Sequence, residues 1–274
     1  MGDSNDIERL FQKEFRLPKY KTKRWVVIND QSRGIYTDAN LIKYDCRPHK
    51  EELVAYHNGY ILIKGYIKST DAATALQNTD NIAHKNGNYS IIQECIVKIE
   101  NNPTDVSQYV YLTMTVLNLF EYSNDYAISI AEAYGFAKDN KNVAADNTGN
   151  TKRKQLLDAF ATDKFPCTLK IPTVHLSPFF RRLDFPLINH AVEIQIKFGN
   201  RLVNGILRGP TPVPDSKITI ESTELVLPVV ELPYDYQEKY GSKMSKGSFP
   251  MTLDWDELKV YEAPNTLKGQ VNYE

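Results

Sequence analysis

Apolar and polar side chains alternate along several segments of the chain, a pattern that predicts β-strands with one buried face and one wet face. The clearest case is residues 192–198, in which every even-numbered position is apolar and every odd-numbered position within the run is polar. The same period of two occurs over residues 61–67 and 95–99. Antiparallel sheets that are covered on one side have this pattern.

Further strands are expected where aromatic or β-branched residues lie between turn-forming residues, at 24–29, 108–119, 165–171, 217–221 and 223–230. The sequence therefore predicts about eight strands in total. Two inserts have helical character. One carries Ala127, Ile130, Ala131 and Tyr134 behind a Ser-Asn-Asp cap, and the other follows Thr151 and carries Leu156, Leu157 and Phe160. Residues 138–150 lack any period and are expected to form a long exposed loop.

The predicted fold class is all-β, an eight-stranded antiparallel jelly-roll β-sandwich with short helical inserts, because long helices do not alternate with the strands as in a βαβ fold. The expected organisation is an N-terminal arm (1–23), a jelly-roll domain (24–232) and a C-terminal extension or the start of a second barrel (233–274). The 17 Tyr, 11 Phe and 14 Pro agree with this, since aromatics favour pleated surfaces and prolines end strands.

Composition narrows the class of protein. The chain has 274 residues, 42% of them apolar, and a net charge of −1, so no global field steers it toward nucleic acid. Three widely spaced cysteines fit neither a disulfide framework nor a zinc ribbon, and a reducing compartment is the default expectation. The acidic start has no signal-peptide pattern, and no apolar run is long enough to span a bilayer. We therefore expect no membrane anchor.

Signatures of catalysis and cofactor binding are missing from the sequence: it has no phosphate-binding glycine loop, no nucleophile elbow and no zinc-protease motif. The best metal candidate is the set Cys46, His49 and His57, which lacks a fourth ligand, so a polar loop is the stronger interpretation. We expect no cofactor.

Two other constellations carry enzyme-like residue types. Cys167, His175 and Asp184 contain the elements of a nucleophile, a base and an orienting acid, but Cys167 lies in an alternating strand, where a buried, inert thiol is usual. Acids around Trp255 are reminiscent of glycosidases, although a solvated face is the more common arrangement. The expectation is that the chain is not an enzyme.

Basic residues gather near the N-terminus and give residues 13–24 a local charge of +5. They are Lys13, Arg16, Lys19, Lys21, Lys23 and Arg24. An arm of this kind can neutralise DNA phosphates. It can also dock on a neighbouring subunit through Phe11, Phe15 and Tyr20, which we favour because these aromatics need burial and six charges give only modest affinity for DNA.

The segment Ser177 to Asn189, Ser-Pro-Phe-Phe-Arg-Arg-Leu-Asp-Phe-Pro-Leu-Ile-Asn, predicts a short helix carrying Phe179, Phe180 and Leu183, followed by extended chain. It resembles a segment of the major capsid proteins of the double-jelly-roll lineage, in the branch of Polinton-like and adintovirus-like elements, of the form S-x-F-[WF]-R-x-L-[DE]-x-P-L-I-N. Residues 56–67, 117–126 and 225–232 resemble the same family in the same order.

The resemblance covers roughly residues 24–260 and implies a jelly-roll barrel that stands upright in a capsid shell. It implies a structural protein of the virion of an icosahedral DNA virus or virus-derived element, made in the host cytoplasm with assembly there or in the nucleus. The implied partners are further copies in a trimeric or pentameric capsomer, other capsid proteins and, through the arm, genomic DNA. The chain departs from the family because its length covers about one jelly roll, where members have two in tandem.

Two alternatives to a capsid role remain open at this point. A carbohydrate-binding or adhesive β-sandwich needs aromatics such as Trp25 and Trp255 on one exposed face. A cupin-like enzyme needs clustered His and Glu ligands, which five scattered histidines do not supply.

Overall fold

Strand pairing in the computed structural model follows the alternation of apolar and polar positions closely. The described residues are 22–32, 34, 36–49, 52–71, 73–85, 87–121, 123, 130–137, 148–183, 186–188, 190–208, 214–231 and 233–234. In β10 (Val192–Lys197), Val192, Ile194 and Ile196 are fully buried. The strong period of two in the sequence therefore marks a central strand whose apolar side faces the core.

Eight long strands pair as one nested antiparallel hairpin. They are β1 (Thr22–Asn29), β2 (Leu41–Cys46), β4 (Tyr60–Ser69), β6 (Glu94–Ile99), β7 (Asn102–Gln108), β8 (Lys164–Pro172), β10 and β12 (Ser216–Glu231). The first pairs with the last, β2 with β10, β4 with β8, and β6 with β7. Two further pairings, β12 with β4 and β10 with β6, roll this hairpin into two sheets.

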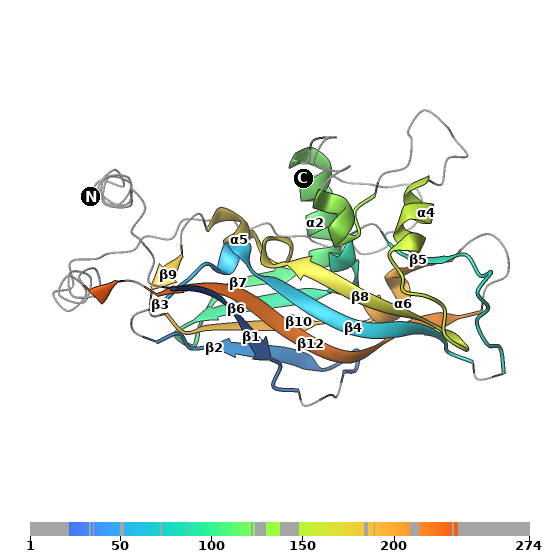
Figure 1. Cartoon of the computed structure of the whole chain (residues 1–274), viewed down its shortest axis with the longest axis horizontal. Coiled ribbons are helices and arrows are strands. Elements are labelled where there is room, and N and C mark those ends of the chain that lie inside the picture. The colour runs from blue at the N-terminus through green and yellow to red at the C-terminus, as the bar shows by residue number, and fades with distance from the viewer. Residues whose placement is uncertain are drawn as a thin grey trace, which may run out of the picture.

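The two sheets have the strand orders β1-β12-β4-β8 and β2-β10-β6-β7, which is the connectivity of a jelly roll (Figure 1). Short strands β3 (Glu52–Val54) and β9 (Leu187–Ile188) extend the first sheet beyond the end of β4. A separate pair forms from β5 (Ile82–His84) and β11 (Ile206–Arg208). The predicted fold class is confirmed: an eight-stranded antiparallel jelly-roll sandwich.

Apolar side chains from both inner faces form one continuous core. The first sheet contributes Ile61, Ile63, Leu225 and Leu227, and the second contributes Ile42, Tyr44, Val97, Ile194 and Ile196, each at most 1% exposed. Burial of this apolar surface is the main driving force that holds the sheets together.

The structure describes several helical elements besides the strands. They are η1 (Tyr56–Asn58), η2 (Asn88–Ile91), α2 (Val110–Glu121), η3 (Ile130–Tyr134), α4 (Thr148–Gln155), η4 (Thr173–His175), α5 (Pro178–Arg182) and α6 (Arg201–Asn204). Of these, α2, α4 and α5 stand along the upper side of the sandwich in Figure 1. The helix predicted after Ser177 is confirmed as α5, with Phe179, Phe180 and Leu183 all buried.

One predicted strand is wrong. Residues 110–119 of the segment 108–119, which was expected to be extended, belong to helix α2, which continues to Glu121. Its Val and Thr residues favour strands locally, but Val110, Met114 and Asn118 are each completely buried at intervals of four residues. Packing against η2 therefore decides the conformation, with a helical period.

The eight-strand total is right although the set of strands differs. The expected strands 217–221 and 223–230 are one strand, β12, whose register shifts between Ile220 and Ser222. Among the eight long strands, the two that the sequence pattern did not indicate are β2 and β7, and it also indicated none of the short strands β3, β5, β9 and β11. In the middle of β4, a Cβ on Gly65 would lie 2.2 Å from the carbonyl oxygen of Thr219, so this glycine permits the close approach of β12 beside the bulge.

The inserts agree in part with expectation. The helix expected after Thr151 begins earlier, at Thr148, and ends before Leu156. Residues 148–150, assigned to the long loop, are therefore its first turn, and residues 138–147 lie outside the described residues. The other insert is described only from Ile130, where it forms a 3₁₀ helix, η3.

Candidate interaction surfaces

Strand β1 forms an exposed edge of the first sheet. Between Lys23 and Asn29 only Val26 and Ile28 are partly covered, whereas Trp25 is 56% exposed and Val27 is 54% exposed. The Trp25 ring lies 5.9 Å from that of Tyr60 on β4, centroid to centroid, across the intervening strand β12. Large apolar groups on a sheet edge are a feature of surfaces that meet another chain.

The structure separates the six basic residues expected to form one arm. Lys13, Arg16, Lys19 and Lys21 lie outside the described residues. Lys23 and Arg24 belong to β1, and Arg24 donates a hydrogen bond to Glu52, which is mostly buried. The other carboxylate oxygen of Glu52 accepts a hydrogen bond from the backbone N–H of His49 at 3.0 Å. Arg24 is therefore a tether between β1 and β3.

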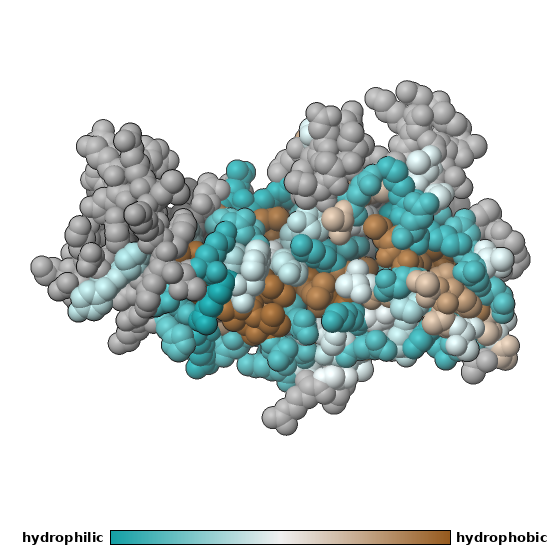
Figure 2. Space-filling view, in the orientation of Figure 1, coloured by the Kyte–Doolittle hydropathy of each residue, from teal (hydrophilic) through white to brown (hydrophobic). Residues whose placement is uncertain are grey.

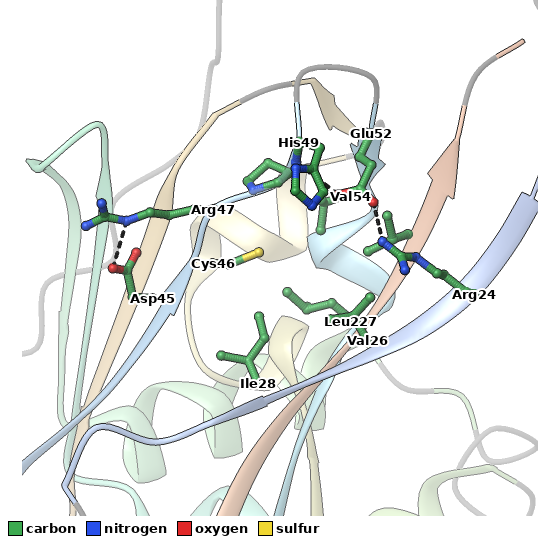
Figure 3. A pocket seen from close by; sticks show the side chains of 12 residues that line it. Arg24, Val26, Ile28, Asp45, Cys46, Arg47, His49, Glu52, Val54 and Leu227 are labelled. Atoms are coloured by element: carbon green, nitrogen blue, oxygen red, sulfur yellow. Dashed lines mark hydrogen bonds and ion pairs between the residues drawn. The ribbon is translucent and has the colours of Figure 1, made fainter.

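A cavity of about 310 Å³ opens between the two edge strands β1 and β2 (Figure 3). Its floor is apolar and includes Val26, Ile28 and Leu227, and its rim carries the pairs Arg24–Glu52 and Arg47–Asp45. The Cys46 side chain points into the space between these pairs in Figure 3.

Two of the three expected metal ligands, Cys46 and His49, line this cavity together with Glu52. The third, His57, lines a different cleft, and no group of three His, Cys, Asp or Glu side chains within the described ranges is arranged to hold a metal ion. Cys46 is also the last residue of β2, where a polar loop was expected. Burial raises the pKa of its thiol to about 11, so the thiol is protonated at neutral pH.

A second cleft, of about 490 Å³, lies on the outer side of the first sheet. Trp25, Tyr60 and Tyr134 line it together with two cations, Lys170 and Arg181. The Lys170 ammonium stands 4.2 Å from the centre of the Tyr60 ring. Figure 2 shows apolar groups along the middle of this face of the molecule, bordered by hydrophilic ones. Trp255, the aromatic that the sequence paired with Trp25, lies outside the described residues, as do its neighbouring acids.

The expected nucleophile and base are both buried in packed positions. Cys167 is 3% exposed in β8, and burial raises the pKa of its thiol to about 12. His175 is 2% exposed between the rings of Tyr89 and Tyr134, and burial lowers its pKa to about 3. Asp184 lies outside the described residues. A protonated thiol and an imidazole this weakly basic have the character of core residues, not of an activated pair.

Helix α2 presents an apolar stripe that the sequence analysis missed. Leu112 (41% exposed), Val116 (40%) and Phe120 (85%) stand four residues apart on its outer side. The helix rises above the sandwich in Figure 1. A helical period would have revealed this stripe, but the segment was interpreted as a strand.

The chain matches no protein-family model and no curated protein sequence. Its fold is similar to that of a chain in the cryo-EM structure of the Sputnik virophage, with a TM-score of 0.57 at 12% identity, over 79% of this chain and 49% of that one. The crystal structure of the mavirus major capsid protein aligns with a TM-score of 0.41 at 10% identity, over 77% of this chain and 47% of that one. The chain thus spans about half the length of these viral proteins.

The Sputnik likeness independently supports the jelly-roll assignment that the strand pairing gives. Among the described helices, none has the length and apolar character needed to cross a membrane.

Proposed function

We propose that this chain is a structural capsid protein, which assembles with copies of itself into the shell of an icosahedral DNA virus or virus-derived element. The observation that carries the proposal is the jelly-roll connectivity, in which β1 pairs with β12 and β2 with β10, together with the likeness to the Sputnik virophage chain. Four sequence blocks that resemble double-jelly-roll capsid proteins, in the same order, point the same way.

The exposed surfaces fit repeated contact between subunits. Trp25 and Val27 on β1, and Phe120 on α2, are large apolar side chains held outward by regular elements. Centres of protein interfaces are enriched in aromatic residues of this kind. An adhesive carbohydrate-binding sandwich needs an array of aromatics on one face, and within the described residues the outer cleft offers Trp25, Tyr60 and Tyr134 beside two cations. We favour assembly because the apolar exposure extends to α2, outside that cleft.

In this proposal the chain works through association and carries out no reaction. The mature location is the virion, and the partners are further copies in trimeric or pentameric capsomers, together with other capsid proteins. The N-terminal arm was expected over residues 1–23, and because β1 begins at Thr22 the arm of this proposal is residues 1–21. It docks on the next subunit and brings Lys13, Arg16, Lys19 and Lys21 near the surface of that subunit or near the packaged DNA. A double jelly roll needs two barrels, so this chain is one half of a longer form, or a single-jelly-roll relative of that lineage, or a barrel whose counterpart another chain supplies.

Negative-stain microscopy and light scattering of the purified chain, over a range of salt and protein concentrations, test the proposal. We expect trimers, pentamers, rings or closed shells whose formation rises steeply with concentration, because association buries the apolar surfaces described above. A chain that stays monomeric under every condition, alone and with candidate partner capsid proteins, would overturn it. Glycan-array binding by such a monomer would support the adhesive alternative instead.

A further inference from the structure

The free edge of β1 differs from the other long edge strands of the two sandwich sheets, β8, β7 and β2. Natural proteins protect edge strands with proline or with charged side chains. Strand β8 contains Pro166 and Pro172, β7 contains Pro103, and β2 carries Lys43 and Asp45. Strand β1 carries Lys23 and Arg24 at its start, followed by the run Trp-Val-Val-Ile from Trp25 to Ile28 without proline or charge. An unprotected apolar edge of this kind is a template for pairing with another strand.

The pairing with β12 determines which backbone groups of β1 are available. The backbone N–H of Ala55 donates to the carbonyl oxygen of Pro228 at 3.1 Å, so this residue of β12 points away from β1. In a strand, the N–H and C=O of one residue point to the same side and successive residues alternate. Leu227 and Val229 therefore point toward β1, where they face Val26 and Arg24.

It follows that the odd-numbered residues of β1 direct their N–H and C=O groups to the open edge. These are Lys23, Trp25, Val27 and Asn29. Within the described part of the chain, β1 pairs with β12 alone, so no other strand forms ladder hydrogen bonds with these outward N–H and C=O groups. The same residues place their side chains on the outer face, where Trp25 and Val27 are more than half exposed. Backbone donors and apolar side chains are thus presented together.

We infer that the β1 edge pairs with β1 of a second copy of this chain, antiparallel and about a two-fold axis at Val26. The inference rests on the proposed self-assembly and names one of its contacts. In this register Trp25 of each copy lies opposite Val27 of the other, as a hydrogen-bonded pair, and Lys23 lies opposite Asn29. Aromatic and β-branched residues facing each other stabilise antiparallel pairs, and here the pair occurs twice.

Charge complementarity favours a second copy over an unrelated strand. One end of β1 carries Lys23 beside Arg24, which is paired with Glu52, and the other end leads into Asp30, which accepts hydrogen bonds from Tyr36 and Ser32. Lys23 and the Asp30 carboxylate are therefore the charges that bear on the direction of pairing. Antiparallel pairing brings the basic end of one copy to the acidic end of the other, whereas parallel pairing would place like charges side by side. The contact joins the two first sheets into one continuous sheet and closes on itself, as an isologous contact must. The β1–β1 contact buries little surface by itself, and it stabilises the assembly together with the other subunit contacts of a shell.

Mixed single-cysteine variants test the register directly. Trp25→Cys and Val27→Cys are purified separately, mixed under assembly conditions and oxidised gently, and the covalent dimers are identified by peptide mass spectrometry. The native cysteines, Cys46, Cys95 and Cys167, are all buried and leave the new thiols as the exposed ones. We expect a disulfide between position 25 of one copy and position 27 of the other, at least about ten-fold above the links that either variant forms alone, because like positions are too far apart to bridge in this register.

A second pair of variants tests the contribution of the backbone. Val27→Pro removes one outward N–H from each copy, and Val27→Thr keeps that N–H while reducing the apolar surface. For Val27→Pro we expect the concentration needed for assembly to rise about ten-fold or more, and for Val27→Thr a smaller increase. Circular dichroism checks whether each variant is folded. If the Val27→Pro variant does not fold, the cross-linking of the mixed cysteine variants still tests the inference.

The outcomes separate this inference from the proposed function. Assembly of the wild-type chain with no excess of the mixed cross-link, or with linkage of β1 to a different segment, overturns β1 self-pairing and leaves the capsid proposal standing. Failure of the wild-type chain to associate at all overturns both.

Discussion

Ser177 and Asp105, which are 72 residues apart in the sequence, are joined by a buried hydrogen bond in which the Ser177 hydroxyl donates to the Asp105 carboxylate. Ser177 is the N-cap of α5 and accepts a hydrogen bond from the backbone N–H of Phe179 at 3.1 Å. The same Asp105 oxygen accepts a hydrogen bond from Ser107 at 3.0 Å. One carboxylate on β7 therefore fixes the start of the helix that carries Phe179 and Phe180 into the core.

Replacing Asp105 tests the stabilising effect of this network. Asp105→Ala leaves two buried hydroxyls without their acceptor, and we expect the free energy of unfolding to fall by about 3 kcal/mol. Denaturant unfolding followed by circular dichroism measures it. Asp38→Ala is the matched control, since Asp38 is exposed, and its effect should stay below about 0.5 kcal/mol. Equal effects of the two substitutions would refute the network's role.

Gly65 is expected to resist even the smallest substitution. In Gly65→Ala the new Cβ would lie 2.2 Å from the Thr219 carbonyl oxygen. Strands β4 and β12 would therefore have to move apart in the middle of their long pairing. We expect a loss of about 3 kcal/mol in thermal or denaturant unfolding. Gly34→Ala serves as comparison, because Gly34 has a φ of +83° and no atom within 4 Å of the added Cβ. We expect Gly34→Ala to lower the free energy of unfolding by about 1 kcal/mol, because alanine is less favourable than glycine at a positive φ.

Stability is expected to depend on pH through two buried histidines. Burial lowers the pKa of His84 to about 4 and that of His175 to about 3, whereas an unfolded histidine titrates near 6.5. As the pH falls below about 6.5 the unfolded chain binds protons that the folded chain does not. Each histidine then removes about 1.4 kcal/mol of stability per pH unit, down to its folded pKa.

Unfolding free energies measured from pH 8 to pH 4 check this prediction. The curve should be flat above pH 7 and descend below it, and His84→Leu should make the descent shallower without reducing stability at pH 8. The ring nitrogens of His84 have no hydrogen-bond partner among the described residues, so leucine removes no bond there. A slope that is unchanged in His84→Leu would show that other groups control the acid transition.

The three cysteines are expected to react slowly with thiol reagents in the folded chain. All three are buried, and burial raises the pKa of the Cys46 thiol to about 11 and that of Cys167 to about 12. Labelling with an aromatic disulfide at pH 8 should be far slower than in denaturant, because the thiolate is the reactive form. Cys46 should react first, since it lines the cavity between β1 and β2. Rapid labelling of Cys167 would contradict its packed position.

Phe120 is expected to matter for association and not for folding. Because its side chain is 85% exposed, Phe120→Ser should leave the melting temperature of the dilute chain within about 2 °C of wild type. We expect the same substitution to raise the concentration needed for assembly, since it removes the most exposed group of the α2 stripe. Leu156→Ser is a matched control, because Leu156 is 45% exposed and lies outside that stripe. If the two variants assemble equally well, the exposed stripe of α2 is not part of a contact between subunits.

The sequence predicts the sandwich well where strands are regular and buried on one face. Strands β4, β6 and β10 have a clear period of two, and the structure places their apolar sides inward. β2 and β7 escaped notice for different reasons. In β2 the buried positions are Ile42, Tyr44 and Cys46, a short run within a polar stretch, and β7 begins with Asn102, Pro103 and Thr104, which are typical of turns.

Helix α2 shows the opposite kind of error, because β-branched residues favour a strand until long-range packing imposes a helix. The surfaces were harder to foresee than the fold. The exposed Trp25 and the buried Phe180 look alike in one dimension, and only the three-dimensional arrangement distinguishes an edge from a core. The six basic residues illustrate the same limit: Arg24 has a fixed partner in Glu52, which lies 28 positions along the chain.

Pairing of the first long strand with the last has a consequence for biosynthesis. During translation β1 leaves the ribosome long before β12 exists, so its Trp-Val-Val-Ile run has no paired strand until β12 has been synthesised. Folds dominated by such distant pairings form slowly, and exposed strands are prone to aggregation meanwhile. Aggregation through β1 during synthesis is therefore the expected limit on the yield of folded chain.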